Sequence, residues 1–256
     1  TVISKQQRLI ELLQEKRKAL ISHVVTKGLN PNAPMKDSGV EWLGNIPSHW
    51  DLRRTKYLFS IKKRIVGTLG FDVLSITQQG VQVKDIEAST GQFSMDYSKY
   101  QLVERGDFAM NHMDLLTGFV DISNYDGVTS PDYRVFSLLD KPQNSPLYFL
   151  YIFQNGYFNK IFYALGQGVS LFGRWRLPAE QFNNFILPVP PKNEQKAIVD
   201  YLEDELSKIS ALIDKAQRAI ALSKEYRAAL ISAAVTGKIC VTKPQATAKP
   251  LTKSRE

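Results

Sequence analysis

The sequence predicts an α+β fold: one mixed α/β domain inserted between two long, antiparallel, coiled-coil-like helices. Three observations support this prediction. Amphipathic helical patterns occupy both ends of the chain, the two patterns resemble each other, and 25 of the 27 aromatic residues lie between them, within residues 30–192. A chain of 256 residues that is 43% hydrophobic and 23% charged has a globular composition and is long enough to bury a sizeable core.

The first predicted helix covers residues 2–26. Apolar side chains from Leu9 to Val24 recur at helical spacing with polar residues between them, which is the pattern of an amphipathic helix. Gly28 and Pro31 follow, and both are typical of the end of a helix.

The second predicted helix begins at Asn193 and ends before Gly237. Apolar residues from Ile198 to Leu230 alternate in steps of three and four, without an intervening glycine or proline. Asn193 suits the N-cap, and Gly237 suits the position just after the last turn. About 43 residues at a rise of 1.5 Å give a helix of roughly 65 Å. So long an apolar stripe needs a helical partner.

The two helices repeat each other at an offset of 210 residues. Between residues 7–26 and 217–236, 12 of 20 positions are identical, including Ala-Leu-Ile-Ser at 19–22 and 229–232. A shared apolar pattern explains the matching leucines but not the matching Arg, Gln and Thr. The chain therefore begins and ends with the same element, as if it belonged to a longer repeating array.

The middle segment combines short strands with a helical stretch. Strands bounded by turn residues are predicted at 72–76, 80–83, 107–111, 118–122 and 133–138. The aromatic-rich stretch 146–165 is predicted to be helical. We divide the chain into a helix at 1–29, an α/β domain at 30–192, a long helix at 193–237 and a disordered basic tail at 238–256.

The net charge of +8 favours a polyanionic partner, and its distribution is more informative than its sum. Residues 30–192 carry 16 basic and 15 acidic side chains, so the middle segment is nearly neutral. Its basic residues are nevertheless concentrated in two groups without an acidic residue among them. These are Arg53, Arg54, Lys56, Lys62, Lys63 and Arg64, and the pair Arg174 and Arg176 around Trp175. Both groups suit contacts with phosphates.

Composition also excludes several classes of protein. The single cysteine, Cys240, cannot form an internal disulfide or a cysteine-based zinc site. Neither a secretory leader nor a run of 18 apolar residues is present. We therefore expect a cytoplasmic protein that does not contact a membrane.

Catalytic, metal and cofactor sites are not predicted. The histidines His23, His49 and His112 stand apart without metal-ligand spacing. Residues 166–168 (Gly-Gln-Gly) lack the third glycine and the Gly-Lys-Ser/Thr of a phosphate loop, so we interpret them as a turn. The Asn-Pro-Pro-Tyr-like run with which adenine methyltransferases hold a flipped base is also absent from the sequence.

Polar side chains that suit hydrogen bonding to base edges fall in predicted loops and at strand ends. Each alone is also consistent with ordinary loop polarity, but together with the basic groups and the neighbouring aromatics they predict a DNA-binding surface. The predicted DNA-binding residues are Arg53, Arg54, Lys62, Lys63, Arg64, Gln78, Gln79, Lys84, Asn111, His112, Asp114, Ser130, Tyr133, Arg134, Gln167, Ser170, Arg174 and Arg176.

Three segments resemble the target recognition domains of Type I restriction-modification specificity subunits. EWLGNIPSHW at 41–50 resembles the start of such a domain, SNYDGVTSPDY at 123–133 resembles its turn-and-strand motif, and LPVPPKNEQKAI at 187–198 resembles the start of the helix that follows it. The Trp-Leu-Gly start combined with the Pro-Pro-x-x-Glu-Gln helix start is more specific than either motif alone. The likeness covers nearly the whole chain except the tail.

The resemblance implies a non-catalytic DNA specificity subunit. Subunits of this family hold two recognition domains, each of which reads one half of a split site on double-stranded DNA. Modification (methyltransferase) subunits grip their helices, and a motor-nuclease restriction subunit joins the complex. This chain has one recognition domain and begins with Thr1, so we expect the C-terminal half of a subunit or a halved subunit. A halved subunit is expected to pair as a homodimer.

Two other functions stay open from the sequence. One is a stand-alone DNA-binding regulator, which would bind tightly as a dimer without partner subunits. The other is a Mg²⁺-dependent nuclease built from Asp132, Glu194 and Lys196, although an acid such as Glu194 is expected in the first turn of a helix from the helix dipole alone. Incubation of the pure chain with Mg²⁺ and plasmid would decide the second.

Overall fold

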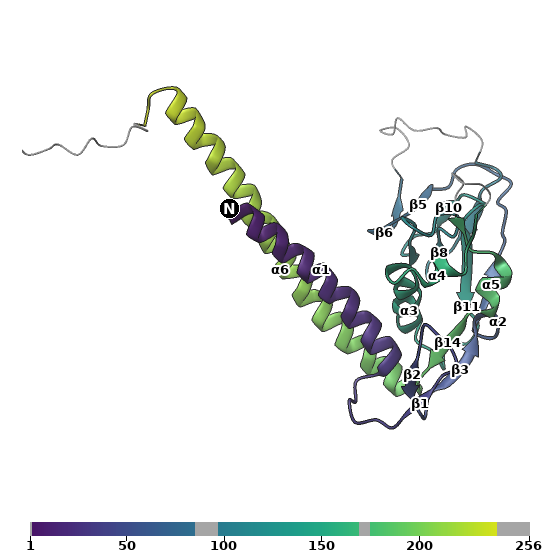
Figure 1. Ribbon diagram of the computed structural model, residues 1–256. Coiled ribbons are helices and arrows are strands. Elements are labelled where there is room, and N and C mark those ends of the chain that lie inside the picture. The colour runs from purple at the N-terminus through teal and green to yellow at the C-terminus, as the bar shows by residue number, and fades with distance from the viewer. Residues whose placement is uncertain (1, 85–96, 169–174, 240–256) are drawn as a thin grey trace, which may run out of the picture. The chain divides into compact units, whose positions relative to one another are not determined.

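The computed structural model describes residues 2–84, 97–168 and 175–239 (Figure 1). The helices are α1 (Val2–Lys27), α2 (Thr55–Leu58), α3 (Pro146–Phe158), α4 (Ile161–Ala164), α5 (Ala179–Asn184) and α6 (Lys192–Val235). The strands are β1 (Met35–Asp37), β2 (Asn45–Pro47), β3 (Asp51–Arg54), β4 (Phe59–Lys62), β5 (Leu74–Thr77), β6 (Gly80–Val83), β7 (Gln101–Val103), β8 (Phe108–Met110), β9 (Val120–Ile122), β10 (Gly127–Thr129), β11 (Arg134–Leu138), β12 (Gln167–Gly168), β13 (Trp175–Arg176) and β14 (Ile186–Val189). Helices at both ends flank a domain that contains sheets, which confirms the predicted α+β class. Residues 240–256 of the predicted tail lie outside the described residues.

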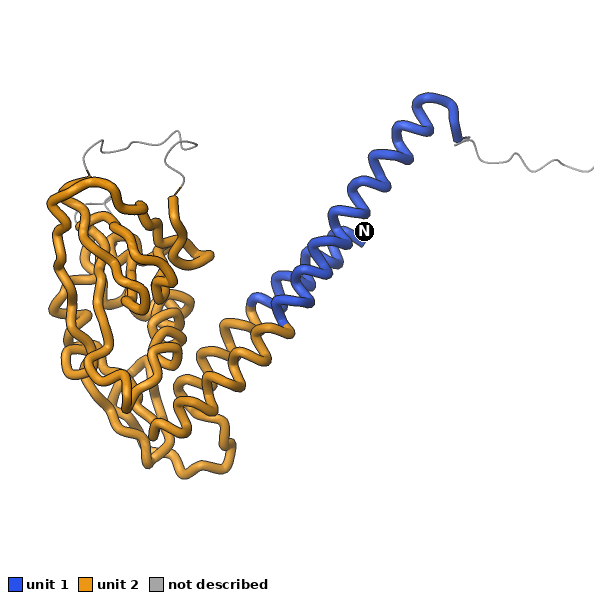
Figure 2. The backbone as a smooth tube through the Cα atoms, turned by 180° about the vertical axis from the view of Figure 1, so that it is seen from behind, with its two compact units in different colours: residues 1–14, 209–256 blue, residues 15–208 orange. Residues whose placement is uncertain are grey.

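The chain forms two compact units (Figure 2). One comprises residues 1–14 and 209–256, and the other comprises residues 15–208. In the first unit, the segments of α1 and α6 lie side by side and antiparallel, and Leu13, Ile209 and Ala216 are buried. Beyond Ala216, no residue of α6 is buried.

The two ends of α6 depend on different signals. The prediction of Asn193 as the N-cap is wrong, because α6 begins at Lys192 and the backbone N–H groups of Glu194 and Gln195 both donate to the carbonyl oxygen of Pro191. Pro191 thus occupies the cap position. The other end is confirmed: Gly237 has a φ of +70°, and the next N–H, of Lys238, donates back to the carbonyl oxygen of Ala233 at 2.8 Å, as in a Schellman motif.

The central element of the larger unit is a four-stranded antiparallel sheet in the order β4-β11-β8-β9. Successive side chains of a strand lie on opposite faces of its sheet. In the paired strands β8 and β11, Phe108 lies opposite Phe136, and Ala109 lies opposite Val135. One face of the sheet is therefore aromatic and the other aliphatic.

The aromatic face packs against α3 and α5. The rings of Phe108 and Phe136 are stacked with their centroids 5.1 Å apart. Phe153 of α3 meets Phe136 edge to face at 5.3 Å, and Phe182 of α5 lies 4.9 Å from the same ring. Edge-to-face and offset aromatic pairs of this kind are favourable beyond the area that they bury. Aromatic side chains of the middle segment thus form one continuous core.

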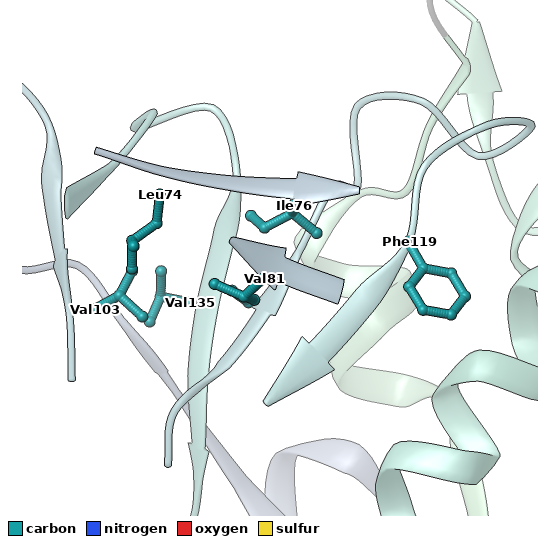
Figure 3. Packing of buried hydrophobic residues seen from close by; sticks show 7 residues of the cluster. Leu74, Ile76, Val81, Val103, Phe119 and Val135 are labelled. Carbon is teal, nitrogen blue, oxygen red and sulfur yellow. The ribbon is translucent and has the colours of Figure 1, made fainter. Parts of the chain in front are cut away.

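The aliphatic face is covered by the β5–β6 hairpin and β7 (Figure 3). The buried cluster on this face consists of Leu74, Ile76, Val81, Val103, Ala109, Phe119 and Val135. The hairpin is therefore fixed on the sheet by its own apolar side chains, and the turn at its tip has a rigid base.

The predicted strands and helical stretch of the middle segment are confirmed. The five predicted strands correspond to β5, β6, β8, β9 and β11 within two residues at each end. The predicted helix at 146–165 is divided into α3 and α4 at Lys160, which has a φ of +55°. The pair β3–β14 was not predicted, because β14 contains Pro188 and β3 contains two arginines, neither of which is typical of a strand.

The end of α1 packs against α3 within the larger unit. Ile21, Val24 and Val25 are buried. The hydroxyl of Tyr148 donates to the carbonyl oxygens of Val25 at 3.3 Å and Pro188 at 3.2 Å. One tyrosine therefore ties the end of α1 to the strand that leads into α6.

Candidate nucleic-acid interface

Loops from four strands meet at one end of the central sheet. The antiparallel register pairs Val135 with Lys62 and Arg134 with Met110, and Met110 with Val120. The C-terminal ends of β4 and β8 and the N-terminal ends of β9 and β11 therefore lie together. Residues 62–64, 111–118 and 130–133 follow or precede these ends. With Gln78, Gln79 and Arg176, which adjoin them as shown below, we call these residues the loop surface.

The loop after β8 is a tight turn held by Asp114. The carboxylate of Asp114 accepts hydrogen bonds from the backbone N–H groups of Leu116 at 3.0 Å and Thr117 at 3.1 Å, and it also accepts the hydroxyl of Thr117. At Gly118, a Cβ would overlap the carbonyl oxygens of Asp114 and Asn111, so the turn requires glycine there. The carboxylate of Asp114, a predicted DNA-binding residue, is thus engaged in hydrogen bonds within the loop.

The tip of the β5–β6 hairpin lies beside this turn. The side-chain amide of Gln78 donates to the carbonyl oxygen of Thr117 at 3.5 Å. At Gly80, which has a φ of +100°, a Cβ would overlap the carboxylate of Asp121. The same carboxylate accepts the N–H of Val81 at 3.0 Å, and burial raises the pKa of Asp121 although hydrogen bonds from Val81 and Ile122 oppose this shift. The hairpin tip is therefore anchored to β9.

The β12–β13 pair reaches the same end of the sheet. The N–H of Leu115 donates to the carbonyl oxygen of Trp175 at 3.1 Å, and Trp175 is stacked on Tyr163. Arg176 and Gln167 are paired across the two strands and both are exposed. The predicted residues Ser170 and Arg174 lie outside the described residues.

Ser130 and Tyr133 lie in a loop that a buried side chain holds in place. The amide of Gln101 donates to the carbonyl oxygens of Ser130 at 2.8 Å and Tyr133 at 2.7 Å, and Gln101 is itself buried. Sequence reasoning missed Gln101, because a glutamine in a strand carries no pattern that marks it as a loop support.

Arg134 is buried beneath the loop surface, and His112 within it is half-buried. Arg134 is only 5% exposed. Its guanidinium donates to the carbonyl oxygen of Leu177 at 3.0 Å and lies 4.6 Å from the centroid of the Phe182 ring. Burial, with a smaller opposing effect from Tyr157 and a further lowering by Arg176, brings the pKa of Arg134 to about 10, so it stays charged at neutral pH. Arg134 therefore supports the fold from within and is not part of the candidate interface.

His112 is neutral at any physiological pH. Burial and the nearby charges of Arg134 and Arg176 lower its pKa to about 3. Its Nδ1 atom is buried without a hydrogen-bond partner among the described residues. A neutral, half-buried imidazole does not attract phosphate, so His112 adds no positive charge to the loop surface.

The basic run at 53–64 is divided between two places. Lys62 and Lys63 lie at the loop surface, and Lys63 is exposed. Arg64 is paired with Asp107 and Glu104, so its charge is already compensated. Arg53 and Arg54 lie in β3, paired with β14, and α2 and the first residues of β4 separate them from Lys62 along the chain. The run is therefore not one continuous phosphate-binding patch.

Two other predicted residues have separate surroundings. Lys84 follows β6, at the end of the hairpin away from the tip, where its N–H donates to the carbonyl oxygen of Val73 at 2.8 Å. Asn111 adjoins the turn: its side chain accepts the N–H of Met113 at 3.3 Å, and its carbonyl oxygen accepts the hydroxyl of Tyr157 at 2.7 Å. Asn111 is thus part of the loop surface, whereas Lys84 is not.

The motifs that carry the family resemblance meet elsewhere, where the chain passes between domain and helices. Glu194 accepts hydrogen bonds from Trp50 at 3.0 Å and from His49 at 2.8 Å. Gln195 is buried, and its side chain accepts the N–H of Ser145 at 2.8 Å and donates to the carbonyl oxygen of Pro190 at 2.9 Å. The His-Trp and Pro-Pro-x-x-Glu-Gln motifs therefore have a structural role: their side chains join the domain to the start of α6.

Two further properties concern the part of the chain that the structure describes. Within residues 2–84, 97–168 and 175–239, no three His, Cys, Asp or Glu side chains are grouped so that they could hold a metal ion. None of the helices there is long and apolar enough to cross a membrane.

A mixed domain with anchored polar loops at one end of its sheet, flanked by long helices, defines a binding protein that presents loops from a rigid scaffold. The chain belongs to the Type I restriction modification DNA specificity domain family, which matches residues 53–220. That match covers more than half of the chain and identifies the class of DNA-recognition specificity subunits.

Solved structures agree with this assignment at the level of the fold. The chain is similar to the HsdS subunit from Thermoanaerobacter tengcongensis, with a TM-score of 0.54, 13% identity and coverage of 93% of this chain and 54% of that one. A second similar chain comes from a study of complex assembly and conformational transition of the type I R-M system, with a TM-score of 0.58, 15% identity and coverage of 93% and 56%. The chain thus spans about half the length of these relatives. No curated protein matches it.

Proposed function

We propose that this chain reads one half-site of a bipartite double-stranded DNA target through its loop surface, and that it performs no catalysis itself. The observation that carries the proposal is the meeting of loops from β4, β8, β9 and β11 at one end of a single sheet, with the hairpin tip beside them. This arrangement places amide, guanidinium and ammonium groups on one rigid platform. Such groups supply the donors and acceptors that base edges and phosphates require.

The structure favours this function over a nuclease. The carboxylate of Glu194 is held by Trp50 and His49 at the junction, whereas Asp132 lies in the loop before β11. The residues of the alternative nuclease site therefore have different structural roles, and Glu194 is engaged in the fold. A stand-alone regulator would use the same loop surface. The two functions differ in whether DNA binding requires partner subunits.

The phosphate contacts of this proposal are assigned to Lys62 and Lys63. Neutralising both with glutamine should weaken binding to all sequences and reduce the slope of log K against log salt by about 0.9 for each phosphate that is no longer neutralised. Arg53→Gln with Arg54→Gln is the matched control, because it removes the same charge from β3. An unchanged slope in the lysine variant would show that these side chains face away from DNA.

We further propose that modification subunits bind the helices, that a motor-nuclease subunit joins indirectly, and that the complex acts on DNA in the cytoplasm. The end of α6 supports a second partner, another recognition domain. Residues 227–236 repeat residues 17–26, and the latter dock on α3. Beyond Ala216, no residue of α6 is buried, and Leu222, Tyr226 and Leu230 are exposed.

We propose that a homodimer in which the end of α6 docks on α3 forms by exchange of helices. In each copy, the docking face of α3 is already covered by its own α1, because Tyr148 and Asn159 bind Val25 and Ser22. A second copy would therefore receive the end of α6 only after its α1 has left. This refines the expected homodimer into a helix-exchanged pair, and a recognition domain without a leading helix would bind more readily.

The deciding experiment is to sequence methylated positions in DNA from cells that express this chain with its cognate modification subunit. The expected result is one interrupted motif that disappears without the chain. Arg176→Ala should relax the motif at one position, since a bidentate arginine–guanine contact contributes about 1–3 kcal/mol of discrimination. Methylation that is independent of the chain, or plasmid cleavage by the pure chain with Mg²⁺, would overturn the proposal.

A further inference from the structure

Leu116 is an apolar side chain at the tip of a polar surface. It is 60% exposed, whereas the adjacent Leu115 is 1% exposed. A single exposed leucine is uninformative in itself. Its setting is more informative, because Leu115 anchors the loop in the core while Leu116 is presented outward from the same turn.

The turn holds Leu116 without packing against it. The N–H of Leu116 donates to the carboxylate of Asp114 at 3.0 Å, the N–H of Gly118 donates to the carbonyl oxygen of Asp114 at 2.9 Å, and no Cβ fits at Gly118. Hydrogen bonds on both sides of the residue thus fix its backbone. A side chain that is already positioned loses less conformational freedom when it binds a partner.

The neighbouring hairpin carries a side-chain amide that is not hydrogen-bonded within the described residues. Gln78 is joined to the turn through the carbonyl oxygen of Thr117. The next residue, Gln79, is exposed, and its side chain has no hydrogen-bond partner in the described part of the chain, since only its backbone N–H is engaged, by Thr77. One amide donor–acceptor pair and one apolar side chain are therefore displayed by two adjacent, anchored turns.

We propose that Gln79 and Leu116 together read an A·T base pair in the major groove, with the amide on adenine and the leucine on the thymine methyl group. Adenine presents an N7 acceptor and an N6 donor in that groove, which match the amide of glutamine, and thymine is distinguished there by its 5-methyl group. The inference rests on the proposed function, because it requires the loop surface to face DNA.

The test isolates the methyl group. Duplexes bound by the full chain are selected from a random-sequence library, and each thymine of the selected half-site is replaced in turn by deoxyuridine, which lacks only the 5-methyl. At one position this replacement should weaken binding about fourfold, as expected for the loss of one buried methyl-sized group. In Leu116→Ala, the same replacement should have no effect.

Two variants complete the design. Leu139→Ala is the matched control, because Leu139 is 58% exposed but follows β11 at the end opposite the loop surface, where its N–H donates to Leu58. It should retain the fourfold effect. Gln79→Ala should lose the preference for adenine at the same base pair.

The outcomes separate this inference from the proposed function. Sequence-selective binding in which no deoxyuridine replacement depends on Leu116 would overturn the A·T assignment and leave the proposed function intact. A chain that selects no sequence from the library would overturn both. Equal effects of deoxyuridine in Leu116→Ala and in Leu139→Ala would assign the methyl contact to another residue.

Discussion

The end of α1 and the end of α6 have nearly the same sequence but opposite surroundings. Ile21 is 1% exposed and its counterpart Ile231 is 54% exposed; Val25 is fully buried and Val235 is 83% exposed. The side-chain hydrogen bond of the matching threonines is nevertheless the same. The hydroxyls of Thr26 and Thr236 donate to the carbonyl oxygens of Ser22 and Ser232 at 2.7 and 2.8 Å, and a glycine with positive φ follows each helix.

This difference shows what a repeated sequence does and does not determine. The threonine hydrogen bond of the last turn is local, so both copies form it. The backbone bonds beyond it differ: Gly28 donates to Val24 after α1, whereas Lys238 donates to Ala233 after α6. Burial requires a partner surface: within the larger unit the copy in α1 packs against α3, whereas the copy in α6 is mostly exposed. Under the proposed function, the exposed copy is a docking element, and variants at matched positions measure how much burial contributes.

The largest difference is expected for the isoleucine pair. Ile21→Ala should lower the free energy of unfolding by about 2–5 kcal/mol, the usual cost of truncating a buried isoleucine. Ile231→Ala should change it by no more than about 0.5 kcal/mol, as expected for an exposed position. Urea denaturation of the full chain measures both. Similar losses at the two positions would mean that the end of α6 is covered in solution, and the contrast would disappear.

A second variant makes the two segments identical. Lys18→Ala, His23→Ala and Val24→Ala convert residues 17–26 into the sequence of 227–236. The helix should still dock on α3, with a loss of about 1.5–3 kcal/mol, mainly from two methyl groups of the buried Val24 and the space that they leave. Retention of the near-ultraviolet circular dichroism would confirm docking. Its disappearance would show that the α6 sequence is unable to occupy the α1 site.

The hydroxyl of Tyr148 is expected to have an intermediate effect. Tyr148→Phe removes the donor to Val25 and Pro188 and leaves buried carbonyl oxygens without that partner, so it should cost about 1–2 kcal/mol. Combined with Ile21→Ala, the loss should be less than the sum, because both changes act on one interface. Strict additivity in a double-mutant cycle would indicate that the hydroxyl acts on β14 alone.

The smallest difference is expected for the serine pair. The side-chain amide of Asn159 donates to the hydroxyl of Ser22 at 3.1 Å, and Ser22→Ala should cost about 1 kcal/mol. Ser232 is exposed, and Ser232→Ala should be neutral. Denaturation curves for the two variants at one protein concentration give the comparison. A cost at Ser232 that grows with protein concentration would reveal a helix-exchanged dimer.

The candidate site was predicted from the sequence only in part. Polar residues at loops and strand ends were recognisable from their types, and the register of β4, β8, β9 and β11 brings Lys62, Asn111 and Ser130 together. Arg134 and Arg64 were indistinguishable from them by type. One is buried under a Phe182 ring and the other is compensated by Asp107, because each pairing depends on segments more than 40 residues away.

Periodic patterns within single segments determined the two helices, their repeat and five of the strands, since these patterns reflect local geometry and the separation of apolar from polar side chains. Tertiary structure alone decided which copy of the repeat is buried, which basic side chains are buried or paired with carboxylates, and that the two motifs at 41–50 and 187–198 meet at Glu194. Each of these depends on contacts between segments distant in the chain. Such contacts depend on how the faces of helices and sheets pack together, which a pattern within one segment does not predict.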